Sequence, residues 1–218
     1  YSIFMELIIK LILCYLVGSI SGSMLMGKLK GVDIRELGSR NAGGTNAFRT
    51  MGTAFSLGVL FIDVLKGYIA VKFVPDLTLG GIITSNTMEE LLNILCGIGV
   101  IMGHVYPIFH GFKGGKGAGT MVGVLAHLSP ISLFICFAIW LAVLIFSGYV
   151  GFSTMIGAIA LPISAFFFYS NGIYSPFGFF SLVVSIFIIF THRSNIHRMI
   201  NGTENRFVKI MIFRRNKS

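Results

Sequence analysis

Residues 117–191 contain no Asp, Glu, Lys or Arg, and this long uncharged stretch limits what the chain can fold into. Charged residues make up only 11% of the whole chain and hydrophobic residues 55%, whereas a soluble domain usually has about 25% charged residues. A single core cannot absorb this much apolar surface, so most of it must face lipid. Spans in lipid must be helices or a closed barrel, because unpaired backbone groups are too costly there. The apolar segments are continuous and lack the alternation of barrel strands, so we predict an all-α integral membrane protein with a single domain over residues 1–218.

Polar segments and Gly- or Pro-containing breaks divide the apolar sequence into seven predicted transmembrane helices, some of them short. The fourth is shorter than the roughly 20 residues needed to cross a bilayer. It is also rich in glycine, which indicates a short or partly re-entrant helix. The predicted spans cover approximately residues 6–27, 53–74, 91–109, 117–128, 131–147, 150–170 and 177–191.

The charges between the spans predict their orientation. Segments 28–49 and 104–119 and the tail from His192 are each net positive, whereas segment 75–90 carries only acidic residues. Positively charged loops of membrane proteins lie in the cytoplasm, and the four later spans return the tail to the same side as segment 104–119. We therefore predict an outside amino terminus and a cytoplasmic carboxyl terminus. The net charge of +9 then belongs to these loops, and we predict no nucleic-acid partner.

The first polar segment, residues 31–49, combines several glycines with hydrogen-bonding side chains. Glycines let backbone N–H groups approach a ligand, and the start of a following helix adds positive potential. Hydroxyl, amide and guanidinium groups complete an oxyanion-binding set, although an ordinary solvated loop is the alternative. The candidate residues are Ser39, Asn41, Thr45, Asn46 and Arg49.

The second polar segment, residues 103–117, has two lysines that flank a pair of glycines, a pattern that resembles a phosphate-binding nest. It is not a nucleotide-binding P-loop, because His110 replaces the first glycine and Gly117 follows Lys116 where Ser or Thr is needed. A flexible basic loop that touches anionic lipid is the alternative. The candidate residues are His104, Lys113, Gly114, Gly115, Lys116 and Gly117.

The third polar segment is the beginning of the tail, from Thr191 to Glu204. On a helix that continues from the last span, His192 and Asn195 share one face. This face could direct an imidazole and an amide toward an active site. A basic helix bound to lipid headgroups is the alternative.

The second predicted span contains an acid and a base, Asp63 and Lys66, three residues apart. On a helix they can pair, which lowers the cost of placing both charges in lipid. Charges inside a membrane are often functional, but a purely structural pair is the alternative.

Together these segments resemble the bacterial membrane-bound glycerol-3-phosphate acyltransferase family that uses acyl phosphate. The resemblance runs from Gly18 to Glu204, nearly the whole chain. The chain departs from the family pattern at Ser21, where proline is expected, at Arg40, where glycine is usual, and at Gly44 and Gly119, where alanine is commoner. The residues that carry the resemblance are Gly18–Ile20, Gly38, Ser39, Asn41, Gly43, Thr45, Asn46, Arg49, Asp63, Lys66, Gly67, Gly103, His104, Pro107, Phe112–Gly117, His192, Arg193, Asn195 and Asn201–Glu204.

The resemblance implies transfer of a fatty acyl group from acyl phosphate to the 1-hydroxyl of glycerol 3-phosphate, giving lysophosphatidic acid and phosphate, the first step of phospholipid synthesis. It implies a seven-helix fold, no metal and no coenzyme A, and a multi-pass location in the bacterial plasma (inner) membrane with a cytoplasmic active site. The expected partners are acyl phosphate, glycerol 3-phosphate, membrane lipids and the enzyme that produces acyl phosphate. The expected catalytic residues are Ser39, Arg49, Lys116, His192 and Asn195. The expected substrate-binding residues are Asn41, Thr45, Asn46, His104, Lys113, Gly114, Gly115 and Gly117, supported by Asp63, Lys66 and Glu204.

Two other functions fit parts of the sequence. A small-anion transporter would also use glycine-broken helices and basic loops, but it should place its polar site near the bilayer midplane and show repeats. A different membrane enzyme acting on lipid phosphates would commonly need acidic metal ligands, and the predicted cytoplasmic segments offer only Asp33, Glu36 and Glu204. The sequence also lacks His-x-x-x-x-Asp and Gly-x-Ser-x-Gly motifs, so no acyl-serine is expected.

Overall fold

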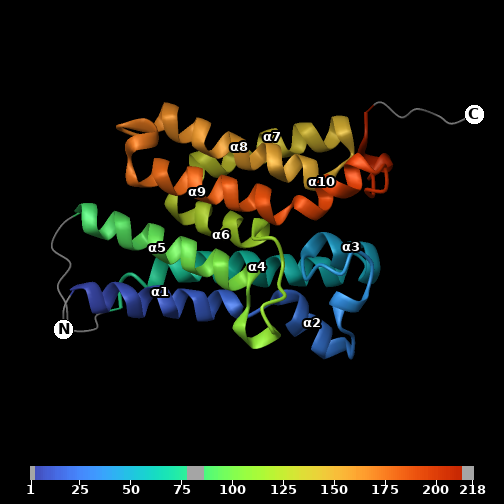
Figure 1. Cartoon of the computed structure of the whole chain (residues 1–218), viewed down its shortest axis with the longest axis horizontal. Helices are drawn as coiled ribbons and strands as arrows, with labels where there is room; N and C mark the ends of the chain where they lie inside the picture. The colour runs from blue at the N-terminus through green and yellow to red at the C-terminus, as the bar shows by residue number, and fades with distance from the viewer. Residues whose placement is uncertain (1–2, 78–85, 213–218) are drawn as a thin grey trace, which may run out of the picture. The chain divides into compact units, whose positions relative to one another are not determined.

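The computed structural model describes residues 3–77 and 86–212, and every regular element in them is helical (Figure 1). The chain forms two compact units, unit 1 (Tyr1–Ser129) and unit 2 (Pro130–Ser218). Each unit buries helix faces against neighbouring helices while large apolar side chains remain exposed along the helices. This distribution is typical of helices that face lipid.

Unit 1 is built on three long helices that pack against one another, with shorter elements around them. A fourth helix, α6, packs against two of the three, and the short elements α2, η1 and α3 lie together at one end (Figure 1). The elements are α1 (Ile3–Ser19), α2 (Gly22–Lys30), η1 (Ile34–Glu36), α3 (Gly44–Met51), α4 (Thr53–Phe73), α5 (Asn86–Val105), η2 (Ile108–His110) and α6 (Ala118–Leu128).

Glycines allow the helices of unit 1 to approach closely. A side chain at Gly18 or Gly103 would collide with backbone where α1 crosses α5, and one at Gly67 or Gly123 would do so where α4 crosses α6. Small residues at such crossings permit the van der Waals packing that holds helices together in lipid. The crossings hold the end of α5 and the beginning of α6 beside α4.

Unit 2 has α8 packed between α7 and α9, with α10 against α8 and α9. Hydrogen bonds from Ser164 to Ser132 (2.9 Å) and from the Trp140 indole to Thr154 (3.2 Å) join α7 to α8. The elements are α7 (Pro130–Ser147), α8 (Val150–Phe168), η3 (Gly172–Tyr174), α9 (Pro176–Thr191), α10 (Arg193–Ile200) and η4 (Val208–Ile210).

The predicted helical architecture is confirmed in the described part of the chain. Five spans are long and apolar enough to cross a membrane, or six if the bent pair α9–α10 counts as one. The short fourth helix is present as α6, of 11 residues. Seven crossings and the orientation of the termini stay predictions, and much of the predicted outside segment lies at residues 78–85, outside the described residues.

Two predicted helices are not continuous. The first span is interrupted at Ile20 and Ser21, where Ser21 has an extended backbone (φ −87°, ψ 120°) and its hydroxyl accepts a hydrogen bond from the Met24 N–H to cap α2. The last span does not run straight into the tail, because α9 and α10 meet at His192 with a bend of 49°. His192 and Asn195 therefore do not lie on one continued helix as predicted.

Candidate active site

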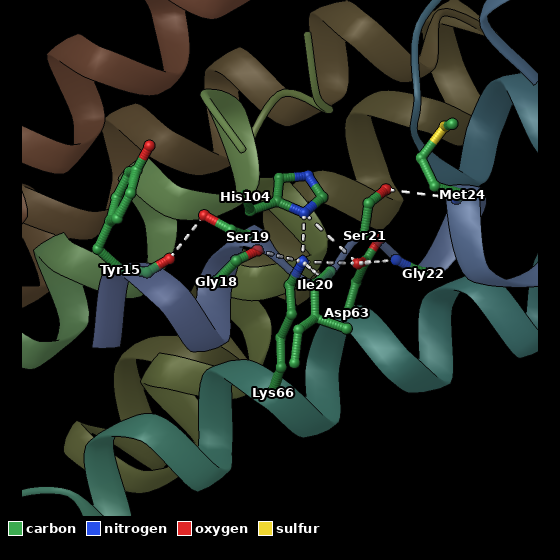
Figure 2. Close-up of polar contacts among 10 residues, drawn as sticks. All are labelled: Tyr15, Gly18, Ser19, Ile20, Ser21, Gly22, Met24, Asp63, Lys66 and His104. Carbon is green, nitrogen blue, oxygen red and sulfur yellow. Dashed lines mark hydrogen bonds and ion pairs between the residues drawn. The ribbon is translucent and has the colours of Figure 1, made fainter. Parts of the chain in front are cut away.

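The interruption between α1 and α2 is stabilised by the buried pair Asp63 and Lys66 on α4 (Figure 2). The Lys66 ammonium donates to the carbonyls of Gly18 (2.9 Å) and Ile20 (2.7 Å), at the end of α1. The Asp63 carboxylate accepts from the Gly22 N–H (3.2 Å), at the beginning of α2, and lies 3.0 Å from the Lys66 ammonium. The cation thus meets the negative end of one helix and the anion the positive end of the next, as the helix dipoles favour. The predicted pairing of Asp63 with Lys66 is confirmed.

His104, at the end of α5, connects this pair to the glycine-rich loop. Its Nδ1 atom lies 3.0 Å from the Lys66 ammonium and 3.4 Å from the Asp63 carboxylate, and the residue is only 3% exposed (Figure 2). On the other side of the ring, the Nε2 atom occupies the space that a side chain at Gly115 would need. The ring is therefore held between a buried ion pair and the loop, which indicates a positioning role more directly than the predicted contact with substrate.

The glycine-rich loop folds back onto the end of α5. The N–H groups of Gly114 and Gly115 donate to the carbonyls of Val105 (3.1 Å) and His104 (3.2 Å). These two amides cannot form the phosphate nest that the glycine pattern predicted, because their hydrogens are already used. The glycines instead allow close packing, since a side chain at either position would collide with His104.

The first polar loop is shaped by Asn46, which is 2% exposed. Its amide NH₂ group donates to the carbonyls of Ile34 (3.1 Å) and Leu37 (3.0 Å), and its carbonyl accepts from the Ser39 N–H (2.9 Å). With both amide hydrogens used in this way, Asn46 can donate to no substrate. It holds the loop that carries Ser39, whereas Asn41, Thr45 and Arg49 are half-buried along the same loop and α3.

The first two polar segments lie beside each other in unit 1. The Arg35 guanidinium donates to the His110 carbonyl (2.9 Å), and the Ala42 carbonyl lies next to the backbone of Gly115. Arg35 also pairs with Asp33 (2.7 Å) and holds the pKa of that carboxyl below its usual value, so the pair stays charged at neutral pH. The structure thus brings the two polar segments together where Arg35 meets His110 and where Ala42 meets Gly115; a shared substrate site for Ser39, Arg49, Lys113 and Lys116 stays a prediction. Lys116 is half-buried and Lys113 exposed.

The third polar segment belongs to unit 2 and forms its own network. The Asn195 amide donates to Glu204 (3.2 Å), whose second oxygen accepts from Arg198 (2.7 Å). Asn195 packs on Gly151, where a side chain would collide with it. The His192 Nδ1 atom lies 2.7 Å from the Ile188 carbonyl, and because a carbonyl only accepts, the proton sits on Nδ1 and the lone pair of the neutral ring on Nε2.

Sequence reasoning missed two contacts of charged residues. The hydrogen bond of Arg35 to the other loop depends on tertiary structure and leaves no sequence signal. Glu6 and Lys10 form a buried pair on α1 (2.6 Å), and Lys10 also donates to the Pro75 carbonyl (2.7 Å); their i, i+4 spacing in an apolar helix was a usable signal. Among the described residues, no cluster of His, Cys, Asp and Glu is arranged to hold a metal ion.

The fold and these loops define an all-helical protein with several membrane-spanning helices and two adjacent polar loops that carry cations. Residues 8–202 match the family described as glycerol-3-phosphate acyltransferase. The chain belongs to this family, and the predicted family membership is confirmed.

Individual relatives agree with this assignment. A glycerol-3-phosphate acyltransferase of Chlorobium phaeobacteroides is 38% identical over 93% of this chain and 97% of the relative, and one of Chlorobaculum parvum is 40% identical over 88% and 92%. The crystal structure of PlsY (YgiH), an integral membrane glycerol 3-phosphate acyltransferase, in its glycerol 3-phosphate form has a TM-score of 0.78 at 33% identity, covering 92% of this chain and 95% of that chain. Its lysophosphatidic acid form has a TM-score of 0.76 at 32% identity, covering 92% and 94%.

The buried pair at the helix interruption generates a stability prediction. Lys66→Met should leave Asp63 charged and uncompensated and remove the donor from the Gly18 and Ile20 carbonyls. Breaking a buried ion pair costs about 3–5 kcal/mol, which corresponds to a fall of roughly 10 °C in the apparent unfolding temperature in detergent.

Lys72→Met is the matched control, because Lys72 lies on the same helix but is exposed, and in the part of the chain that the structure describes its ammonium contacts the Tyr68 hydroxyl (3.1 Å) and two nearby rings. Its unfolding temperature should stay close to that of the unsubstituted protein. Equal unfolding temperatures for the two variants would contradict the capping role of Lys66.

Proposed function

We propose that the protein transfers a fatty acyl group from acyl phosphate to the 1-hydroxyl of glycerol 3-phosphate, producing lysophosphatidic acid and phosphate. The observation that carries this proposal is the adjacency of two cationic, glycine-containing loops in a member of the glycerol-3-phosphate acyltransferase family. The related PlsY is known in a glycerol 3-phosphate form and in a lysophosphatidic acid form, which correspond to the acceptor and the product of the proposed reaction.

Both proposed substrates carry a phosphate group, and unit 1 offers groups of suitable charge. Arg49, Lys113 and Lys116 supply cations, of which Arg49 can form two parallel hydrogen bonds to one phosphate. Ser39 and Asn41 add neutral donors on the first loop. The first-turn N–H groups of α6, which follow Gly117, have no acceptor within the helix and favour a bound anion. We assign these amides, in place of those of Gly114 and Gly115, to the acyl phosphate.

The protein mainly has to position the acceptor hydroxyl and stabilise charge, because acyl phosphate is already an activated mixed anhydride. The 1-hydroxyl oxygen attacks the acyl carbon, the bond from that carbon to the phosphate oxygen breaks, and phosphate departs. Cations and amides that face the developing charge lower the barrier. The hydroxyl proton passes either to a substrate phosphate or to His192, whose Nε2 lone pair is set by the hydrogen bond between Nδ1 and Ile188.

The membrane arrangement we propose has seven crossings in the plasma membrane, with the basic segments and the active site at the cytoplasmic face. α6 has 11 residues and is therefore roughly 16 Å long, about half of the hydrocarbon thickness. Because α6 alone is too short to cross the hydrocarbon, the glycine-rich loop before it and the turn at Ser129 after it would complete this crossing. Acyl phosphate would reach the site from the enzyme that produces it.

The donor assignment is tested with purified protein in detergent. Palmitoyl phosphate should release phosphate and form lysophosphatidic acid only when glycerol 3-phosphate is present, because the acyl carbon needs the acceptor hydroxyl. Palmitoyl-CoA should not replace the donor. Full product formation from palmitoyl-CoA together with none from palmitoyl phosphate would overturn the donor assignment.

The cationic loops are tested by substitution. Arg49→Ala and Lys116→Ala should each lower kcat/KM at least about tenfold, the effect of losing roughly 1.4 kcal/mol of transition-state stabilisation. Lys28→Ala, which removes an exposed cation from α2, is the matched control and should keep its activity. Near-normal rates for both loop variants, with unfolding temperatures unchanged, would exclude these side chains from the phosphate site.

A further inference from the structure

Arg40 has a backbone conformation that arginine rarely adopts. Its φ is +58°, in the left-handed region, where the Cβ atom of most residues crowds the backbone. In the described residues, Phe112 and Asn171 are the other non-glycine residues with positive φ, and asparagine tolerates this region well. Backbone strain of this kind persists only where the surrounding structure imposes it, and it is often found at functional sites.

The surrounding loop fixes Arg40 in this conformation. The Arg40 N–H donates to the Leu37 carbonyl (3.0 Å), and the same carbonyl accepts from the Asn46 amide (3.0 Å). On either side, Asn46 holds the Ser39 N–H (2.9 Å) and the Asn41 carbonyl accepts from the Gly43 N–H (2.9 Å). These bonds set the backbone before and after Arg40, so its left-handed conformation is part of the loop's structure.

The side chain of Arg40 carries an accessible charge. The residue is exposed while its neighbours Ser39 and Asn41 are half-buried. Across the described residues, the structure gives its guanidinium no hydrogen bond or ion pair, in contrast to Arg35, which is held by Asp33 (2.7 Å). An exposed guanidinium between two proposed substrate-binding residues is suited to a dianionic phosphate, because its planar fork can donate two parallel hydrogen bonds.

We propose that Arg40 is a further substrate-binding residue that binds the phosphate of glycerol 3-phosphate. This proposal rests on the proposed function and adds a cation to the same site. We assign Arg40 to the acceptor because the first-turn amides of α6 are proposed to bind the phosphate of the donor, whereas Arg40 lies on the other loop, between Ser39 and Asn41. A phospholipid headgroup has the same phosphate chemistry, so the test is made in detergent without added phospholipid.

The experiment separates the charge of Arg40 from its backbone strain. Arg40→Gln keeps a long side chain in the strained position but removes the charge, Arg40→Lys keeps the charge, and Arg40→Asn removes the charge while tolerating the left-handed conformation. KM for glycerol 3-phosphate is measured at saturating palmitoyl phosphate, and KM for palmitoyl phosphate at saturating glycerol 3-phosphate. Lys28→Gln on α2 is the control for loss of an exposed cation.

We expect Arg40→Gln and Arg40→Asn to raise KM for glycerol 3-phosphate roughly two- to fivefold, as for an exposed charged contact, with kcat within about twofold of the unsubstituted enzyme. KM of Arg40→Lys should stay within about 1.5-fold of the unsubstituted value, and Lys28→Gln should not change KM. Arg40→Asn should unfold at a higher temperature than Arg40→Gln. An unchanged KM for glycerol 3-phosphate in both Arg40→Gln and Arg40→Asn overturns the proposal, whatever happens to KM for palmitoyl phosphate. A rise in KM for glycerol 3-phosphate in Arg40→Lys that equals the rise in Arg40→Gln also overturns the proposal. An unsubstituted protein without acyl transfer would instead overturn the proposed function, so the two failures are distinguishable.

Discussion

The contact of Lys66 and Asp63 with the ends of two successive helices is the interaction on which unit 1 depends. A membrane-spanning helix that is interrupted exposes carbonyl and N–H groups that hydrocarbon cannot satisfy. Lys66 supplies hydrogens to the carbonyls of Gly18 and Ile20, and Asp63 accepts from the Gly22 N–H. The pair therefore makes the interruption tolerable. α2 begins after this interruption, and the polar loop with Ser39 follows from its end.

The same pair organises the second loop through His104. The imidazole lies against Lys66 on one side and packs on Gly115 on the other, and Gly114 and Gly115 donate back to the last carbonyls of α5. Glycines at the α1–α5 and α4–α6 crossings let these helices come close enough for the contacts to form. Arg35 then joins the two loops directly. Polar contacts therefore connect the buried Asp63–Lys66 pair, through His104, to the two polar loops of unit 1.

The helices were predictable from the sequence because apolar length and Gly/Pro punctuation are local signals. The predicted spans 53–74, 117–128 and 131–147 agree with α4, α6 and α7 to within a residue or two, and the spacing of Asp63 and Lys66 was enough to predict their pairing. The interruption at Ile20 was not predictable, since its stability comes from side chains on another helix. The hydrogen bonds of Asn46 and of the Gly114 and Gly115 amides were not predictable for the same reason: they involve backbone groups that only the folded loops bring near. The substrate contact of Asn46 stays a prediction. For His192 and Asn195, their place in the reaction stays a prediction.

We propose that the two polar loops of unit 1 and the tail of unit 2 lie on the cytoplasmic side of the membrane. The most direct measurement is labelling of single introduced cysteines by a membrane-impermeant thiol reagent in inside-out and right-side-out vesicles. Glu36→Cys and Thr203→Cys report the first loop and the tail, Asp76→Cys reports the predicted outside segment, and all three positions are exposed whereas the native cysteines are buried. We predict that positions 36 and 203 are labelled only in inside-out vesicles and position 76 only in right-side-out vesicles. Labelling of positions 36 and 203 from opposite sides of the membrane would contradict the proposal that the first loop and the tail share the cytoplasmic side.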